Sequence, residues 1–382
     1  MPKVIIGMSG GVDSSVTAYL LKEQGYEVEG VSFVMWEATK GTPPATCCSL
    51  QSMESASENA RYLGIRHSTI DIRDDFLKKV IEPFVDAYLN GLTPNPCVLC
   101  NRLIKFPHLI KEAEKRNAEI ISTGHYARVE STKSKEQRAR SIHNSGHFSD
   151  YFFLKKGIDP RKDQSYVLYV LRQEELKRLI LPLGYYKKDD VRKVAKELNL
   201  PAAERSESQE ICFIEDRKYL HFVESISPVA EKAGQIIDLN GKAIGTHKGI
   251  HGYTIGQRKG LGISSPKPLY VVNTDIQKNT VYVGPREAAK KREFSVDDLN
   301  WITPLFPPLA IGNKKGLKLR ASVKVRSTMK DEPATIYIAE SEEQRAVRVV
   351  FDEPQWAPAP GQSAVFYNQD RVIGGGVIKK SV

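Results

Sequence analysis

The sequence predicts a doubly wound α/β domain at the N-terminus, followed by a small β-rich unit and a C-terminal β-barrel. Three observations lead to this fold class. Strand and helix patterns alternate through the first half of the chain, which is typical of a parallel sheet with helices on both faces. Alternating strand patterns and glycine turns take over at about residue 204. Beyond about residue 290, roughly five or six short strands are typical of a small barrel.

The length and composition are those of a globular protein with two or three domains. The chain has 382 residues, of which 41% are hydrophobic and 27% are charged. We place the domain boundaries at 1–205, 206–285 and 286–382. No apolar run reaches the length of a membrane span, and the N-terminus has the pattern of a core strand rather than of a signal peptide. We therefore expect a cytoplasmic protein with no membrane partner. The net charge of +10 favours a polyanionic binding partner.

A glycine-rich turn joins the first strand to the first helix. Residues 4–6 are Val-Ile-Ile, which suits a buried strand, and a helix pattern runs from Val16 to Gly25. Between them stands Ser9-Gly-Gly-Val-Asp-Ser-Ser15, a run that points backbone N–H groups and a positive helix end at an anion. It has neither the ending of a Walker A loop nor the spacing of a dinucleotide fingerprint. It resembles the pyrophosphate loop of the ATP pyrophosphatases, and the alternative is an ordinary strand-to-helix turn.

Further strands and helices follow in order through the first domain. Strands are predicted at 27–33, 65–70, 119–123 and 151–156, and helices at 52–63, 74–90, 103–117, 173–180 and 187–199. Residues 131–150 are polar and predict a loop. Ligands of such sheets bind beyond the carboxyl ends of the strands. We therefore expect residues 7–14, Phe33 and the run Thr123-Gly-His-Tyr126 to converge on one nucleotide.

In the β-rich half, Asn240-Gly241 predicts a hairpin, and barrel strands are predicted near 317–326, 334–339, 346–351, 363–367 and 371–378. The first of these places four cations on one face, at Lys318, Arg320, Lys324 and Arg326. Such a row favours contact with a nucleic-acid backbone. The alternative is a solvated edge strand that is protected by its lysines and arginines.

The five cysteines are too few and too scattered for a disulfide scaffold. Cys97 and Cys100 form a Cys-x-x-Cys pair just before a predicted helix, which allows a redox pair, half of a zinc site or an incidental pair. Cys47 and Cys48 could complete a zinc site, but adjacent cysteines are poor chelating partners. Cys212 lies between an isoleucine and a phenylalanine, where a lone cysteine is usually a small buried hydrophobe.

Taken together, these motifs resemble those of the bacterial tRNA-specific 2-thiouridylases, and the resemblance covers essentially the whole chain. It implies a PP-loop, HUP-like ATP pyrophosphatase domain ahead of the β-rich unit and the barrel. The motifs that carry it are Gly-Met-Ser-Gly-Gly-Val-Asp-Ser-Ser at 7–15, Thr-Pro-Asn-Pro-Cys-Val-Leu-Cys-Asn at 93–101, Thr-Gly-His-Tyr at 123–126, Lys-Asp-Gln-Ser-Tyr at 162–166, Glu-Ile-Cys-Phe-Ile at 210–214, Gly-Gln-Arg-Lys-Gly-Leu-Gly-Ile at 256–263, Pro-Gly-Gln-Ser-Ala-Val-Phe-Tyr at 360–367 and Gly-Gly-Gly at 374–376.

The resemblance also implies the roles of individual residues. The residues implied to bind ATP are Gly7, Met8, Ser9, Gly10, Gly11, Val12, Asp13, Ser14, Phe33 and Gly124. Those implied to contact tRNA are Asn95, Pro96, Cys97, His125, Lys162, Asp163, Gln164, Arg326, Ser327 and Gln362. Cys100 matches the nucleophile and Cys212 the persulfide carrier, so that turnover leaves a Cys100–Cys212 disulfide, which must be reduced.

The expected reaction is ATP-dependent 2-thiolation of the wobble uridine of tRNA. ATP with Mg²⁺ adenylates the C2 oxygen, and sulfur from Cys212 then replaces it with the help of Cys100. Cys97 departs from the family, many members of which carry aspartate there, so the proton role passes to Cys97 as thiolate or to water. In a second possible route, Cys97, Cys100 and Cys212 jointly hold an iron–sulfur cluster with one open iron for sulfide.

Two functions other than tRNA thiolation remain as hypotheses. An ATP pyrophosphatase that acts on a small carboxylate or amide would leave Cys100, Cys212 and the cationic strand without a use. A non-catalytic tRNA-binding protein would leave the intact pyrophosphate loop unexplained. The expected partners are the anticodon loop of tRNA and a sulfur donor, either a cysteine desulfurase or a sulfur carrier, and we expect a monomer.

Overall fold

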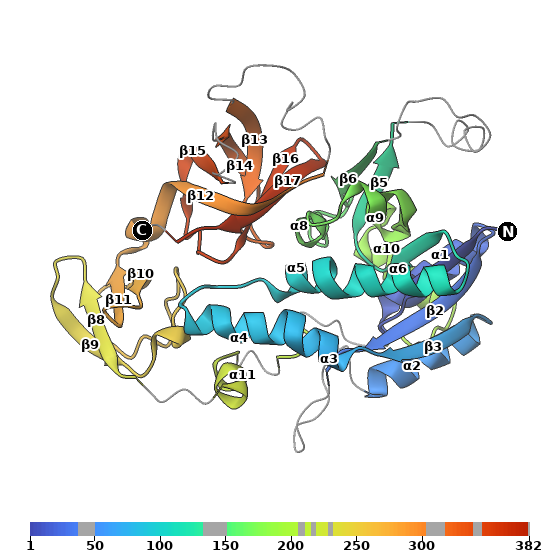
Figure 1. Ribbon diagram of the computed structural model, residues 1–382, viewed down its shortest axis with the longest axis horizontal. Coiled ribbons are helices and arrows are strands. Elements are labelled where there is room, and N and C mark those ends of the chain that lie inside the picture. Colours follow the sequence, from blue (N-terminus) through green and yellow to red (C-terminus); the bar gives the residue numbers. More distant parts are fainter. Residues whose placement is uncertain are drawn as a thin grey trace.

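The computed structural model describes residues 1–36, 50–132, 151–204, 211–214, 219–227, 232–302, 318–338 and 346–380. Figure 1 shows an α/β unit, a small β unit and a barrel, which confirms the predicted fold class. The predicted loop at 131–150 and the pair Cys47–Cys48 lie wholly or mostly outside the described residues. None of the described helices combines the length and the apolar character that a membrane crossing requires.

The first unit is built on a parallel sheet of five strands in the order β3-β2-β1-β4-β7. The strands are β1 (Lys3–Gly7), β2 (Glu27–Val34), β3 (Arg66–Asp71), β4 (Ile120–Thr123) and β7 (Leu179–Ile180). The three apolar residues of β1 are fully buried because helices cover both faces of the sheet. The chain order reverses between β1 and β4, and such a switch point opens a crevice at the carboxyl ends of the two strands.

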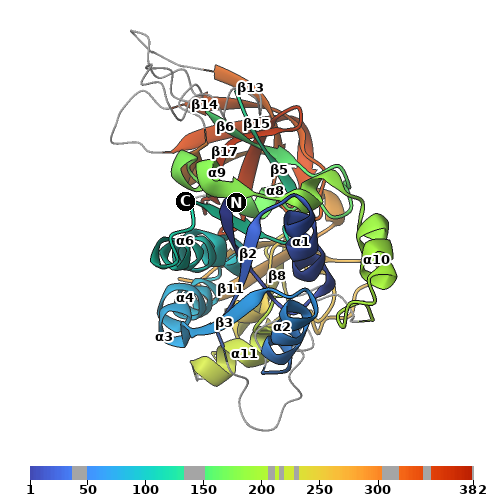
Figure 2. The ribbon, with the colours of Figure 1, turned by 90° about the vertical axis from the view of Figure 1, so that its right-hand side faces the viewer.

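Successive residues of β1 face opposite layers of helices. Val4 and Ile6 pack with α1 (Val12–Glu23), α2 (Leu50–Tyr62) and α10 (Lys188–Glu197). Ile5 packs with the layer that contains α4 (Glu82–Leu89) and α6 (Phe106–Lys115). Figure 2 shows these two layers on either side of the sheet. The alternation of side chains along a strand thus accounts for the doubly wound arrangement.

The second layer contains two interrupted helices, each with a proline. The predicted helix at 74–90 consists of α3 (Arg73–Phe76), a π turn at Leu77–Ile81 and α4, which has Pro83 in its first turn. The predicted helix at 103–117 begins earlier, with α5 (Pro96–Cys100), and continues through a π turn at Asn101–Lys105 into α6, which has Pro107 in its first turn. Proline has no backbone N–H, so one helical hydrogen bond is missing at each proline, and a π turn precedes it in both helices. Because the helix begins at Pro96, the Cys-x-x-Cys pair lies within it rather than before it.

The central unit is a four-stranded sheet in the order β10-β11-β8-β9. The strands are β8 (Gly234–Asp238), β9 (Ala243–His247), β10 (Tyr270–Asp275) and β11 (Thr280–Gly284), and the short helix α11 (Tyr219–Ile226) precedes them. The predicted hairpin is confirmed, because β8 and β9 pair in antiparallel fashion across the Asn-Gly turn. Gly241 adopts a φ of +82° there, which glycine tolerates without strain.

The third unit is a barrel closed by six strands in the order β12-β15-β14-β13-β16-β17, with β17 returning to β12. They are β12 (Lys290–Trp301), β13 (Lys318–Lys324), β14 (Glu332–Ile338), β15 (Val347–Trp356), β16 (Ser363–Asn368) and β17 (Arg371–Ile378). A hairpin from the first unit, β5 (Ala127–Ser131) and β6 (Phe152–Lys156), joins this sheet where Lys155 pairs with Arg371. The domains thus share one sheet, which no pattern in the sequence predicts.

The alternative that β13 is a solvated edge strand is wrong, whereas contact of its cations with a nucleic-acid backbone stays a prediction. The strand lies between β14 and β16, so it is not an edge, and protein groups already neutralise much of its charge. Arg320 forms two bonds of 2.8 Å to the carboxylate of Asp352. Lys324 is buried, with its Nζ 3.9 Å from Asp163. The alternation of side chains predicts the strand correctly. It cannot predict the carboxylates that other elements bring to it.

Candidate functional site

A cavity of about 940 Å³ lies at the carboxyl ends of β1, β2 and β4. It is the site that the switch point of the sheet predicts. Its wall includes most of the residues singled out in the sequence: Gly7, Met8, Ser9, Asp13, Ser14, Phe33, Asn95, Pro96, Cys97, Cys100, Gly124, His125, Asp163, Gln164, Cys212, Ser327 and Gln362. Gly10, Gly11, Val12, Lys162 and Arg326 are not part of the described wall.

The glycine-rich turn supplies one end of this cavity. Gly10 has a φ of +73°, so a side chain at this position would strain the backbone. The hydroxyl of Ser14 donates to the carbonyl of Gly11 over 3.1 Å and accepts from the backbone N–H of Ser9 over 3.2 Å. These bonds tie the turn to the first residues of α1, whose N-terminal N–H groups and dipole favour an anion.

The carboxylate of Asp13, in the first turn of α1, accepts two short hydrogen bonds. Its Oδ1 lies 2.6 Å from the hydroxyl of Tyr126 and 2.6 Å from the Nζ of Lys188. The lysine side chain is only 5% exposed. The sequence does not single out Lys188, because a lysine at the start of a predicted helix is not a distinctive pattern. Tyr126 belongs to the run at 123–126 that the sequence predicts near the nucleotide, but its bond to Asp13 could not be predicted.

The loop before α5 is held from both sides. Asn95 caps the helix, since its Oδ1 accepts from the backbone N–H of Val98 over 3.4 Å. From the barrel, the side-chain amide of Gln362 donates to the carbonyls of Thr93 (3.0 Å) and Pro94 (3.3 Å). The backbone N–H of Thr93 donates to the carbonyl of Pro360 over 2.8 Å. The barrel therefore fixes the loop that presents the first cysteine pair.

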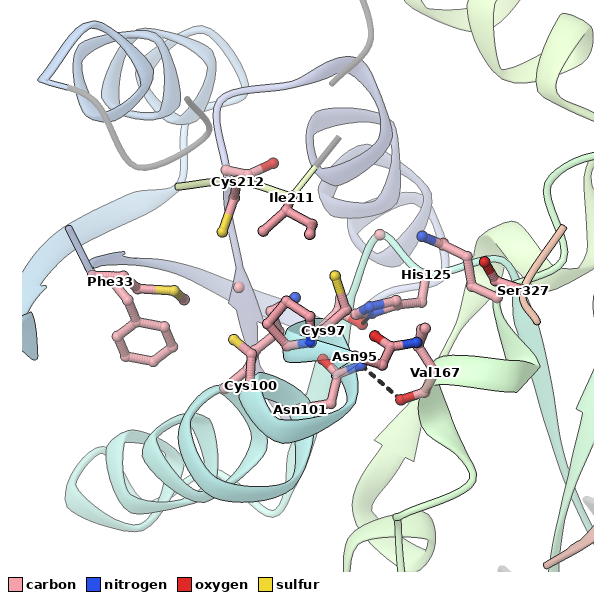
Figure 3. Close-up of a pocket in the computed structure, with 18 of the residues that line it drawn as sticks. Phe33, Asn95, Cys97, Cys100, Asn101, His125, Val167, Ile211, Cys212 and Ser327 are labelled. Carbon is pink, nitrogen blue, oxygen red and sulfur yellow. Dashed lines mark hydrogen bonds between the residues drawn. The ribbon is translucent and has the colours of Figure 1, made fainter. Parts of the chain in front are cut away.

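Cys97 and Cys100 stand three residues apart on α5 and both line the cavity. Cys97 is exposed, whereas Cys100 is buried, and both are thiols, as is Cys212. Figure 3 shows the side chains of Cys100 and Cys212 on the same cavity, although they come from different elements. The Cys100–Cys212 disulfide stays a prediction, since both residues are free thiols in this structure.

Cys212 is positioned by its neighbour. Phe213 is buried and makes edge-on contacts with the rings of Phe76 and Phe84, with centroids 5.7 and 5.3 Å apart. A backbone bond of 3.0 Å from Ile214 to Ile211 closes a turn around the cysteine. With Phe213 in the core, Cys212 stays half-buried on the cavity wall. Cys212 is therefore only partly buried, since it packs against the core and also lines the cavity.

Two further polar side chains face this part of the cavity. His125 is buried, and its Nδ1 lies 2.7 Å from the hydroxyl of Thr123. Burial lowers the pKa of His125 well below its usual value, and the charge of Lys105 lowers it further. Asn101 donates from Nδ2 to the carbonyl of Val167 over 2.9 Å, while its buried Oδ1 has no partner in the described part of the chain (Figure 3).

The remaining residues predicted to contact tRNA are placed less uniformly. The carboxylate of Asp163 accepts from the backbone N–H groups of Gly157 and Ser165, at 3.1 and 3.0 Å, which shapes its own loop. Arg326 donates from Nη2 to the carbonyls of Ile255 and Ala357, so it connects the barrel to the central unit. Ser327, just beyond it, does reach the cavity wall.

The described residues contain no group of three or more His, Cys, Asp or Glu side chains arranged to hold a metal ion. The three cysteines on the cavity wall therefore do not fit the ligand set of an iron–sulfur cluster in this structure.

Comparisons with known proteins cover nearly the whole chain. The family model described as "tRNA methyl transferase HUP domain" matches residues 2–216, "tRNA methyl transferase PRC-barrel domain" matches 221–285, and "Aminomethyltransferase beta-barrel domain" matches 291–378. The chain is 44% identical to tRNA-specific 2-thiouridylase MnmA 1 of Caldanaerobacter subterraneus subsp. tengcongensis, over 100% of this chain and 98% of that protein. It is 41% identical to tRNA-specific 2-thiouridylase MnmA of Clostridioides difficile, over 100% and 99%.

Proposed function

The chain belongs to the family of tRNA-specific 2-thiouridylases, and we propose that it replaces the C2 oxygen of the wobble uridine of tRNA by sulfur in an ATP-dependent reaction. The observation that carries this proposal is a single cavity lined by the pyrophosphate loop, by the cysteine pair of α5 and by Cys212. The pyrophosphate loop activates the oxygen, and the cysteines supply the sulfur that replaces it. Methyl transfer, which the names of two matching domain models suggest, would need none of these three features.

We propose that the first step is adenylation of the uridine. The C2 oxygen attacks the α-phosphorus of ATP, which is bound with Mg²⁺, and pyrophosphate leaves. The backbone N–H groups at the start of α1 and the serine hydroxyls of the turn receive the departing phosphates. Because oxygen is a poor leaving group from C2 and AMP is a good one, this step makes the later displacement feasible.

Sulfur arrives as a persulfide on Cys212, loaded by a cysteine desulfurase or a sulfur carrier. In one route its terminal sulfur attacks C2 and AMP leaves, after which the Cys100 thiolate attacks the Cys212 sulfur and releases thiouridine. In the other route Cys100 attacks the Cys212 sulfur first, and the hydrosulfide that is released attacks C2. Both routes end in a Cys100–Cys212 disulfide, which an external thiol must reduce. The half-buried position of Cys212 supports its role as the carrier that meets a donor protein.

The cysteine at position 97 replaces the aspartate of many relatives, and we propose that it contacts the base. It is the exposed member of the pair on α5, and it lines the cavity beside Asn95 and Pro96. A cluster on Cys97, Cys100 and Cys212 is the alternative, but the described residues do not present the three as a metal-ligand set. We therefore route no step through it.

We propose that residues 286–382 bind tRNA together with the catalytic domain at 1–205, that 206–285 form the linker with Cys212 and the central domain, and that the protein acts as a monomer. Support for joint binding comes from Gln362 and Ser327, which the barrel contributes to the cavity wall. Asn95, His125 and the loop with Lys162, Asp163 and Gln164 supply the other proposed tRNA contacts. The flipped anticodon base would enter where these elements meet.

The test is thiolation of an unmodified tRNA transcript with ATP, Mg²⁺, cysteine and a cysteine desulfurase. We expect 2-thiouridine at the wobble position, with AMP and pyrophosphate released in equal amounts to the thiouridine, and no product without ATP. Thiolation that proceeds equally well without ATP would overturn the proposal. So would release of pyrophosphate with a small carboxylate or amide in place of tRNA.

A further inference from the structure

The loop between β6 and α8 (Ser165–Leu168) is bonded directly to the segment that follows β4. The backbone N–H of Gln164 donates to the carbonyl of Tyr126 over 2.9 Å. In return, the Oε1 of the Gln164 side chain accepts from the backbone N–H of Tyr126 over 2.9 Å. This reciprocal pair holds both backbone groups of Tyr126, so a displacement of Gln164 displaces Tyr126 with it.

The other end of Tyr126 reaches the pyrophosphate loop. Its hydroxyl donates to the Oδ1 of Asp13 over 2.6 Å, and its ring is 2% exposed, packed in a core cluster with Val12 and Val16 of α1 and Val191 of α10. A ring enclosed in this way moves with its neighbours rather than independently of them.

Two glycines show how closely these segments approach one another. A Cβ on Gly124 would lie 2.9 Å from the backbone nitrogen of Ser14, and one on Gly157 would lie 2.9 Å from the carbonyl oxygen of Tyr126. Both contacts are with backbone, which cannot move aside cheaply. The segment at 124–126 is thus confined between the pyrophosphate loop and the loop that carries Gln164.

A second connection runs in parallel with the first. The Oδ2 of Asp159, at the start of the same loop, accepts from the backbone N–H of Lys188 over 3.1 Å. The Nζ of Lys188 then donates to the same Oδ1 of Asp13 over 2.6 Å. Asp159 and Lys188 are 2% and 4% exposed. Both ends of the loop at 159–164 therefore lead to one oxygen atom in the first turn of α1.

We propose that Tyr126 is a positioning residue that makes nucleotide binding at the pyrophosphate loop and RNA binding at Gln164 depend on one another. The inference rests on the proposed function, since it takes Gln164 as a tRNA contact. RNA that holds Gln164 fixes Tyr126, and the hydroxyl of Tyr126 in turn fixes Asp13 and the N–H groups around it. Nucleotide and RNA thus stabilise the same bonded arrangement of Gln164, Tyr126 and Asp13, so each ligand raises the affinity for the other.

The experiment measures the affinity for α,β-methylene-ATP, which cannot be split between the α and β phosphates, with and without saturating tRNA. Coupling free energies of this kind usually change affinity by roughly 5–150-fold. We expect tRNA to tighten nucleotide binding to the unaltered protein within that range, and the factor to fall toward one in Tyr126→Phe. The ring and its packing remain in this variant, so a merely structural role would leave the factor unchanged.

Tyr62→Phe is the matched control, because it also removes a single tyrosine hydroxyl bond in the first unit, the 2.7 Å bond to the carbonyl of Leu198. It should keep the full factor. By reciprocity, the nucleotide must tighten tRNA binding by the same factor in each protein, which checks the measurement internally.

The possible failures can be told apart. If the unaltered protein does not bind tRNA, the proposed function fails, and with it the inference. If it binds both ligands and Tyr126→Phe keeps the same factor as Tyr62→Phe, the inference is overturned and the proposed function stands. Should Tyr126→Phe not fold, judged by its thermal unfolding, Asp13→Ala removes the acceptor of the Tyr126 hydroxyl and of Lys188, and it must lower the factor. A full factor in that variant is equally decisive against the inference.

Discussion

The side-chain amide of Gln362, in the barrel, donates to the carbonyl oxygen of Thr93 over 3.0 Å, in the loop that precedes Cys97. A second bond, of 3.3 Å, reaches the carbonyl of Pro94. The barrel thus contributes to the wall of the cavity as well as forming a separate unit. The sequence placed Gln362 only at a tRNA contact, and its bonds to the loop give it a structural role as well.

Replacing Gln362 with alanine should therefore impair catalysis. The variant loses two hydrogen bonds to half-buried carbonyls, each worth about 1 kcal/mol, and the loop before α5 loses its anchor. We expect kcat/KM for tRNA to fall about tenfold or more, which corresponds to about 1.4 kcal/mol. Gln355→Ala is the control, because the Gln355 amide also donates to a backbone carbonyl, that of Glu353, on an exposed stretch of β15. Equal activity of the two variants would contradict the anchoring role.

Lys188→Met should weaken ATP binding. In the folded protein the ammonium group of Lys188 neutralises Asp13 beside the place proposed for the phosphates. Without it, the carboxylate repels the triphosphate, and we expect KM for ATP to rise about tenfold, with a smaller effect on kcat. Lys193→Met removes an exposed lysine from the same helix and should behave as the unaltered protein. Adding Asp13→Asn to Lys188→Met should recover part of the affinity; a further loss would show that Asp13 does not repel the nucleotide.

The identity of residue 97 separates the two sulfur routes. The persulfide route needs Cys100 and Cys212, so Cys97→Asp, which restores the residue common among relatives, should keep desulfurase-driven thiolation within about threefold, a change of less than 1 kcal/mol. A cluster would lose a ligand in this variant, and activity would disappear together with protein-bound iron. The measurement is the thiolation rate beside the iron content after anaerobic purification.

Protein stability should fall as the pH drops below about 6.5, the ordinary pKa of histidine. Burial lowers the pKa of His125 in the folded protein, so below pH 6.5 the unfolded chain binds a proton that the folded one does not. The free energy of unfolding then decreases with falling pH, by up to about 1.4 kcal/mol per pH unit for one group. Urea unfolding at a series of pH values should show a shallower slope for His125→Asn. The exposed His221, changed to asparagine, is the control, and an equal slope in the two variants would refute the assignment.

Local patterns revealed much of this molecule before its structure did. The turn at Ser9 could be predicted because its functional residues are consecutive in the sequence. The barrel strands could be predicted because apolar and polar residues alternate along each strand. The partners of the β13 cations could not be predicted, because Asp352 and Asp163 approach Arg320 and Lys324 from other elements. Lys188 was missed for the same reason: its partner Asp13 is distant in sequence, and only the packing of α10 against α1 brings them together.

The central feature of the proposed reaction is Cys212 as the sulfur carrier. The measurement is the mass of the peptide that contains Cys212, after incubation of a Cys100→Ser variant with a cysteine desulfurase, cysteine and no tRNA. We predict one additional sulfur atom on Cys212, which Cys100 can no longer discharge, and a Cys100–Cys212 disulfide in the unaltered protein after a single turnover with tRNA and ATP. If Cys212 gains no sulfur while Cys212→Ala thiolates tRNA at the full rate from the same desulfurase, Cys212 is not the sulfur carrier.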